Sequence, residues 1–200
     1  MRLATYSALF AAFFLFLGSC DSKNSQQGDQ LFADGDYEQA VSQYTDYIEY
    51  NPEDIKSIYN RGRAYEELGE YDKSLADYEK TLEIDPKNFN ALMSTGKFHF
   101  RNQDHGDAAF YFDKAIKVKE RSADAHYLSG RANHKLGKTA KAMEGYNQAI
   151  SLNSEYGEAY LYRGALKVFM KKKSGGCADI KKAAALEAPE AAQALQKYCN

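Results

Sequence analysis

Five glycines recur at a spacing of 34 residues, and this period is the feature that most limits what the chain can fold into. They are Gly28, Gly62, Gly96, Gly130 and Gly164. A large residue, aromatic in four of the five cases, follows each glycine sixteen residues later: Tyr44, Tyr78, Phe112, Tyr146 and Ile180. Self-similarity at a fixed period of this length predicts stacked copies of one supersecondary unit.

Each repeat is predicted to form two antiparallel helices that pack closely. Gly62 lies in the middle of a helix expected over about residues 55–68, where glycine costs up to about 1 kcal/mol relative to alanine. A close approach of the second helix explains this glycine, and the small Ser74 serves the same contact from the other side. Pro52 and Pro86 are expected to end second helices, because the residue before a proline is pushed out of the helical region.

Residues of one repeat follow the pattern of the tetratricopeptide repeat (TPR): Gly69, Tyr71, Ser74, Tyr78 and Pro86. The chain resembles that family over residues 21–187, in five units of which the first and last are degraded. The resemblance implies an all-α fold, a right-handed TPR superhelix of about five helix-turn-helix repeats. We expect the array over residues 30–187 and a C-terminal capping helix over residues 188–200.

Residues 1–19 are predicted to be a signal peptide. Arg2 precedes an uncharged run over residues 3–17, shorter than the roughly twenty residues that a membrane-spanning helix needs. The run ends in Leu17-Gly18-Ser19-Cys20, which resembles the lipobox of bacterial lipoproteins. That resemblance implies cleavage before Cys20, acylation of its thiol with chains such as palmitate, and attachment to a membrane. An uncleaved anchor or an ordinary secretory signal is the alternative.

Residues 20–29 are predicted to be the lipidated cysteine and a flexible tether. The segment from Asp21 to Gln27 is polar and lacks the apolar surface that would stabilise an ordered structure. We therefore expect the folded part to begin near residue 29, in the periplasm or on the cell surface. The sequence leaves open which membrane of the bacterial cell envelope, and which leaflet, carries the anchor.

Charge and motifs argue against nucleic acid as a partner and against catalysis. The formal net charge is −2 and the pI is near 6.1, which provides no overall field for a phosphate backbone. No nucleophile elbow, phosphate loop or zinc-protease motif occurs in the sequence. His126 and His134 lie two helical turns apart without an acidic or thiol partner at ligand spacing. We expect no enzyme activity, no cofactor and no metal site.

Two cysteines remain if Cys20 carries lipid, namely Cys177 and Cys199. In an exported, oxidising setting they form either a disulfide or two free buried thiols. The C-terminal segment resembles that of many bacterial TPR proteins at Cys177, Asp179, Lys182, Ala183 and Cys199. This resemblance favours the disulfide.

The TPR resemblance implies a concave binding groove lined by the first helix of each repeat. One repeat position gives an apolar and aromatic row: Tyr59, Met93, Tyr127 and Leu161. A second position gives a row of cations: Arg63, Lys97 and Arg131. The alternative is an ordinary solvated surface in which the cations pair with nearby acids such as Glu66.

These features predict a protein–protein interaction scaffold, a membrane-anchored TPR lipoprotein. Its groove would hold a peptide or helical segment of another envelope protein, with aromatic anchors providing affinity and cations aligning an acidic segment. A cell-wall polymer or glycan-binding module is the alternative, since tyrosine-lined concavities can stack on sugars. A homo-oligomer is a further option.

Overall fold

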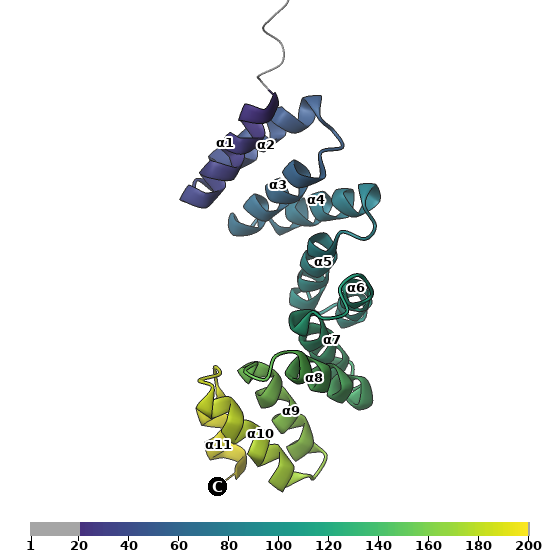
Figure 1. The fold of residues 1–200 in the computed structure, drawn as a ribbon, viewed down its shortest axis with the longest axis vertical. Coiled ribbons are helices and arrows are strands. Elements are labelled where there is room, and N and C mark those ends of the chain that lie inside the picture. Colours follow the sequence, from purple (N-terminus) through teal and green to yellow (C-terminus); the bar gives the residue numbers. More distant parts are fainter. Residues whose placement is uncertain (1–20, 200) are drawn as a thin grey trace, which may run out of the picture. The chain divides into compact units, whose positions relative to one another are not determined.

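The computed structural model describes residues 21–199, and all regular elements there are α-helices, which confirms the all-α prediction (Figure 1). The chain divides into two compact units, the first ending at Glu70 and the second beginning at Tyr71. None of the helices between residues 21 and 199 is long and apolar enough to cross a membrane.

The first unit contains three helices. They are α1 (Asp21–Asp34), α2 (Tyr37–Tyr50) and α3 (Ile55–Glu67). α1 packs along α2, and α2 packs in turn against α3. Ala40, Tyr44 and Ala64 form the buried core of this unit.

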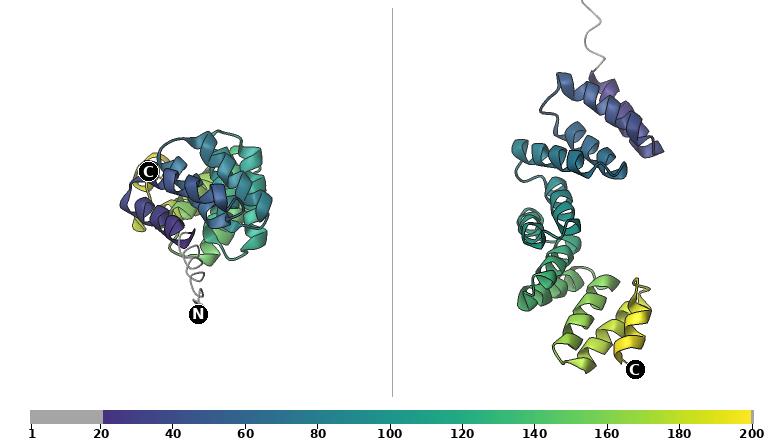
Figure 2. Two further views of the ribbon diagram at one scale, coloured as in Figure 1. Left: turned by 90° about the horizontal axis from the view of Figure 1, so that it is seen from above. Right: turned by 180° about the vertical axis from the view of Figure 1, so that it is seen from behind.

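The second unit contains eight helices, each packed against the next in the chain (Figure 2). They are α4 (Tyr71–Ile84), α5 (Phe89–Arg101), α6 (His105–Val118), α7 (Ala123–Lys135), α8 (Thr139–Leu152), α9 (Gly157–Phe169), α10 (Lys173–Ala185) and α11 (Ala191–Cys199). The last of them, α11, contacts both α9 and α10 and covers the end of the stack.

The start of the folded part differs from the expectation of a tether up to residue 29, because α1 begins at Asp21. The Asp29 carboxylate ties this helix to both of its neighbours. It accepts hydrogen bonds from the Tyr44 hydroxyl at 2.7 Å and the Asn60 amide at 2.9 Å, and it forms an ion pair with Lys56. These bonds stabilise a polar helix that has little apolar surface of its own. Residues 1–19 and Cys20 lie outside the described residues.

The predicted role of the periodic glycines is confirmed within each unit. A Cβ atom on Gly28 would lie 2.7 Å from the Tyr44 ring, and one on Gly96 would lie 2.6 Å from the Phe112 ring. Such distances are far below ordinary carbon–carbon contact at about 3.5–4.0 Å. Glycine is therefore required because the large side chain of the second helix packs directly on the backbone of the first.

The turn between the two helices of a repeat has one position in the left-handed region. Its φ values are +85° at Gly35, +74° at Gly69, +67° at Gln103, +71° at Gly137 and +61° at Lys171. Glycine adopts this conformation without steric cost, whereas a residue with a Cβ atom is strained there by roughly 1–2 kcal/mol. The turns at Gln103 and Lys171 therefore carry strain that the other three do not.

Two interactions hold the C-terminal helices together. Cys177 of α10 and Cys199 of α11 are joined by a disulfide, with an S–S distance of 2.08 Å. Two residues further along α10, the buried Asp179 carboxylate accepts two hydrogen bonds from the Arg163 guanidinium, both at 2.8 Å, and one from Lys167 at 2.7 Å. The end of the array is therefore fastened by a covalent bond and by a buried ion cluster.

Candidate functional site

An arginine held between aromatic rings is the most distinctive polar feature of the second unit. Arg131 lies on α7, and its guanidinium carbon is 4.9 Å from the ring centre of Phe100 on α5 and 4.7 Å from that of Tyr162 on α9. The ring of Tyr127, one helical turn earlier on α7, is 5.8 Å away. Three first helices of successive repeats thus contribute to one cation–π cluster.

The aromatic part of this cluster is rigid because it is continuous with the core. Tyr127 is 7% exposed, and its ring centre lies 4.8 Å from that of Tyr156 and 6.3 Å from that of Tyr146. Burial raises the pKa of Tyr127 to about 12, and the nearby charge of Arg131 acts in the opposite direction. The Tyr127 hydroxyl is accordingly protonated at neutral pH, and Arg131 is the charged group of the cluster.

The guanidinium of Arg131 has no carboxylate partner within 4.0 Å among residues 21–199. Arg163, on the neighbouring α9, provides the contrast, because its guanidinium is occupied by Asp179 and by the Asn147 side chain. Arg131 is half-buried, so part of the residue remains accessible to solvent. A planar guanidinium in a fixed position is suited to bind a carboxylate through two parallel hydrogen bonds.

Three of the predicted groove residues are core residues instead. Met93, Tyr127 and Leu161 are 8%, 7% and 6% exposed, so the expectation that they form an accessible apolar row needs correction. The physical reason is that these side chains fill the space between helices. Met93 belongs to the core cluster around Phe112, and Leu161 to the one around Ile180.

The predicted cations have different surroundings. Lys97 is exposed on α5, whereas Arg131 is clamped as described above. In the first unit, Arg63 of α3 is exposed and lies over the Phe32 ring at 4.3 Å, and Tyr59 is half-buried. Among the seven predicted residues, Tyr127 and Arg131 lie together, with the guanidinium of Arg131 over the Tyr127 ring.

Phe100 and Tyr162 belong to the cluster but were not among the predicted residues. Phe100 lies three residues after Lys97 on the same predicted helix, at a repeat position that faces the groove in the TPR family. Its position in the repeat was therefore a signal that could have identified it. Tyr162 follows Leu161 directly, and it does not occupy a repeat position that is expected to face the groove. Its contribution depends on the approach of α9 to α7, which the sequence pattern does not show.

The histidines take part in packing within the second unit. The His99 ring stacks on the Tyr111 ring with centres 5.4 Å apart, and Nδ1 of His134 lies 3.2 Å from the Tyr146 hydroxyl. Burial, together with the charges of Lys135 and Arg131, lowers the pKa of His134. No group of three or more His, Cys, Asp or Glu side chains suited to a metal ion occurs in the part of the chain that the structure describes.

These helical hairpins have a 34-residue period, and Gly28, Gly96 and Gly130 each pack against an aromatic ring of the second helix. Such features define a protein built from helix-turn-helix repeats. The tetratricopeptide repeat model matches residues 55–88, and the model of anaphase-promoting complex, cyclosome, subunit 3 matches residues 75–152. The chain therefore contains a tetratricopeptide repeat and has the TPR fold. No curated protein sequence matches it significantly.

Solved structures of TPR proteins have the same fold. A crystal structure of MamA protein is 22% identical with a TM-score of 0.78, and the match covers 88% of this chain and 96% of that one. MamA from Desulfovibrio magneticus RS-1 is 20% identical with a TM-score of 0.79, covering 85% and 96%. YrrB, described as a TPR protein with an unusual peptide-binding site, is 16% identical with a TM-score of 0.77, covering 89% and 91%.

Proposed function

We propose that this TPR protein is a lipid-anchored scaffold of a bacterial envelope that binds an acidic segment of another protein at Arg131. The observation that carries the proposal is the Arg131 guanidinium, which three helices hold between aromatic rings without a carboxylate partner in the described chain. A peptide carboxylate is the ligand that this group fits best.

The cluster supports binding because its geometry is set before the ligand arrives. Ordering a long side chain on binding costs about 0.5–1.5 kcal/mol, and the rings around Arg131 already restrict its conformations. Lys97 lies exposed on α5, one helical turn before Phe100, and adds a second cation that can interact with an acidic segment. The neighbour YrrB, described as having a peptide-binding site, supports a peptide as the class of ligand.

The proposed anchor is carried by Cys20 in Leu17-Gly18-Ser19-Cys20. Each buried methylene contributes about 0.8 kcal/mol, so two or more acyl chains would attach the protein stably to a membrane. The disulfide between Cys177 and Cys199 supports an exported location, because such bonds persist in oxidising compartments. A Cys20→Ala precursor should remain uncleaved and leave the detergent phase, and processing like that of wild type would refute the anchor.

Glycan binding is less well supported by the same residues. Sugars stack on open aromatic faces, but Tyr127 is 7% exposed and Tyr146 is fully buried. Tyr162 is half-buried and contacts both of these rings. The rings therefore hold Arg131 in place and offer little flat surface to a sugar.

Photo-crosslinking in intact cells tests the position of the binding face. A photoreactive residue in place of Lys97 should give an adduct with one major envelope protein. The matched control is the same residue in place of Lys117, which is also exposed but lies on α6, a second helix of its repeat. Equal labelling from both positions would contradict the assignment of the ligand to the first helices.

A titration with the captured segment tests Arg131 itself. Arg131→Ala should weaken binding by about 2 kcal/mol, near thirtyfold, and flatten its salt dependence because a charge pair is lost. Arg131→Lys keeps the charge but loses the planar fork, so it should recover only part of the affinity. Unchanged affinity in both variants would show that Arg131 has a packing role alone.

A further inference from the structure

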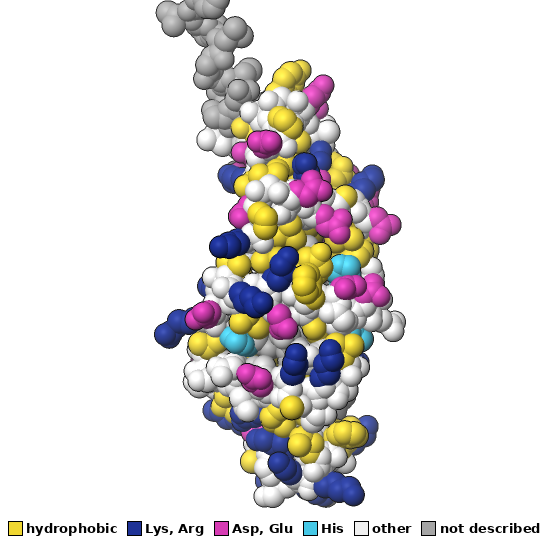
Figure 3. All heavy atoms as spheres, turned by 90° about the vertical axis from the view of Figure 1, so that its right-hand side faces the viewer, with side chains coloured by type: hydrophobic (Ala, Val, Ile, Leu, Met, Phe, Trp, Pro, Cys, Tyr) yellow, Lys and Arg dark blue, Asp and Glu magenta, His cyan; other side chains and the backbone are white. Residues whose placement is uncertain are grey.

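The turns that join the two helices in each of the last two repeats form a basic surface. Residues 135–143 contain three lysines and residues 167–178 contain four, and neither segment contains an acid. Six of these seven side chains are exposed: Lys135, Lys138, Lys141, Lys171, Lys172 and Lys173. Figure 3 shows Lys and Arg side chains gathered at the C-terminal end of the second unit. The surface is therefore suited to a negatively charged partner.

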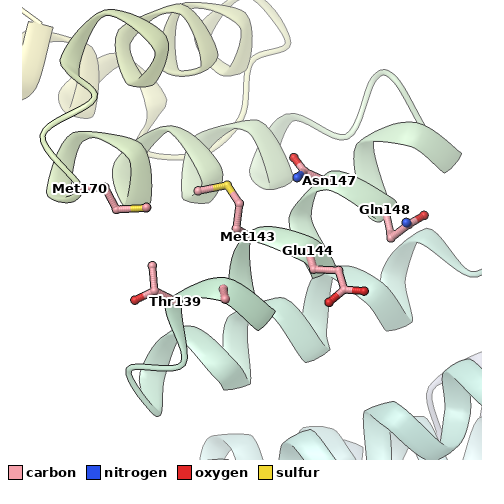
Figure 4. A pocket seen from close by; sticks show the side chains of 7 residues that line it. Thr139, Met143, Glu144, Asn147, Gln148 and Met170 are labelled. Carbon is pink, nitrogen blue, oxygen red and sulfur yellow. The ribbon is translucent and has the colours of Figure 1, made fainter.

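Apolar groups lie in the middle of this basic surface. Phe169 is 79% exposed and Met170 is 38% exposed, which is unusual for side chains of their size. Met170 and Met143 face a hollow of about 530 Å³ between α8 and the end of α9 (Figure 4). The other lining residues all belong to α8: Thr139, Ala140, Glu144, Asn147 and Gln148. The hollow has the apolar centre and polar rim of a protein-docking site.

The first unit of the same chain has the complementary chemistry. Residues 21–70 contain twelve acids and four lysines or arginines, a net charge of −8, although the whole chain carries only −2. At the end of α2, Tyr50 is 78% exposed. Exposed acids flank it on both sides, at Glu49 and Glu53. An exposed aromatic ring between carboxylates matches an apolar hollow between lysines.

We propose that the basic turns bind the acidic α2–α3 turn of a second copy of this chain. Tyr50 of one copy would enter the hollow between Met143 and Met170 of the other, and Glu49 and Glu53 would pair with lysines 171–173. The two surfaces are different, so the contact is heterologous and joins copies head to tail. It uses neither Arg131 nor its aromatic rings, and it is independent of the peptide site.

A second copy accounts for the hollow better than a membrane surface does. A flat layer of anionic lipid would attract the lysines and Phe169, but the hollow and its polar side chains Glu144, Asn147 and Gln148 would have no partner. An inserted tyrosine supplies both an apolar ring and a hydroxyl group. The charge of −8 on the partner unit also provides long-range attraction, as steering between oppositely charged proteins requires.

Isotope-mixed crosslinking tests the contact directly. The full chain is prepared with ¹⁴N and with ¹⁵N, mixed in mild detergent, and treated with a carbodiimide that joins lysines to acids in direct contact. We expect heavy–light crosslinks between lysines 171–173 and Glu49 or Glu53. Crosslinks of these residues only within one isotopic species, or no such crosslinks, would overturn the proposal.

Charge reversal gives an independent measurement by sedimentation velocity. Lys171→Glu/Lys172→Glu/Lys173→Glu should weaken self-association at least about tenfold, and so should Glu49→Lys/Glu53→Lys. Combining both sets in one chain should restore association, because each surface again meets the opposite charge. The matched control Lys87→Glu/Lys117→Glu/Arg121→Glu changes the charge equally at exposed positions elsewhere and should have little effect.

Two further outcomes would refute the proposal. Equal weakening by the control triple would show a net-charge effect without a specific surface. The second outcome is binding of the lysines to a lipid surface. Flotation of the protein with phosphatidylglycerol vesicles and with phosphatidylcholine vesicles measures this binding. The surface would be assigned to a membrane if two results occur together. More protein would bind the anionic than the neutral vesicles, and this difference would disappear in the Lys171/Lys172/Lys173 variant. Charge reversal would leave self-association unchanged.

Discussion

Gly96→Ala adds one methyl group where Phe112 of α6 packs directly on the backbone of α5. The new Cβ atom would lie 2.6 Å from Cε1 and 2.8 Å from Cδ1 of Phe112. This is about 1 Å closer than ordinary carbon–carbon contact. Phe112 is fully buried, so its ring cannot move away without displacing its neighbours in the core.

The expected effect is the difference between two opposing terms. Overpacking of this kind costs about 1–3 kcal/mol, while replacing glycine by alanine inside a helix gains up to about 1 kcal/mol. We expect the free energy of unfolding to fall by about 1–2 kcal/mol, which lowers the melting temperature by about 3–6 °C in a chain of this length. Gly106→Ala is the matched control, because a Cβ atom there would meet nothing within 4 Å.

The measurement is thermal unfolding followed by circular dichroism, with hydrogen exchange locating the loss of protection to α5 and α6. Gly106→Ala should leave stability unchanged or raise it slightly. Gly96→Ala combined with Phe112→Leu should lose less than the sum of the two single changes, because the smaller side chain relieves the clash. A Gly96→Ala protein as stable as the Gly106→Ala protein would refute the packing argument.

Three further predictions concern the turns and the C-terminal end. Gln103→Gly should raise the free energy of unfolding by about 0.5–1 kcal/mol, because φ is +67° there, whereas the same change at Gln148 inside α8 should lower it. Burial favours a raised pKa for Asp179, but hydrogen bonds and charges from Arg163 and Lys167 hold that pKa below its usual value. Its contribution to stability is therefore present above about pH 4 and lost as the pH falls below that range. An Asp179→Asn protein that keeps the same acid sensitivity in unfolding titrations would contradict this. Cys177→Ser/Cys199→Ser opens a loop with a sequence separation of 22, worth about 3 kcal/mol, and should accelerate hydrogen exchange mainly in α11.

The repeat could be predicted from the sequence because it depends on local and periodic chemistry. Gly96 and Phe112 are separated by a constant sixteen residues, as are Gly28 and Tyr44, and such pairs recur wherever two helices of one hairpin touch. Pro52 and Pro86 act on their own backbone, and α2 and α4 end just before them, at Tyr50 and Ile84. These signals need no knowledge of how repeats pack against one another.

The candidate site was only partly predictable because it depends on contacts between repeats. Arg131 was found from its repeat position, but its neighbours Phe100 and Tyr162 come from helices in the repeats before and after it. Met93 and Leu161 were assigned to a groove because position alone does not distinguish a half-exposed side chain from one that fills a core. Formation of α1 likewise depends on Asp29, because its hydrogen-bond partners Tyr44 and Asn60 lie on other helices.

The disulfide at the C-terminal end gives this chain a direction of disassembly. A linear array opens from its ends, because an end repeat has a neighbour on one side only. Here the last helix is covalently closed onto α10, whereas α1 is held to α2 and α3 by hydrogen bonds and a small core. A processive protease that starts at α11 meets a crosslink that must first be reduced, whereas one that cuts within α1 meets no covalent crosslink among the described residues. Degradation of the fold should therefore begin in the acidic N-terminal repeats. The repeats nearest the disulfide should be degraded last.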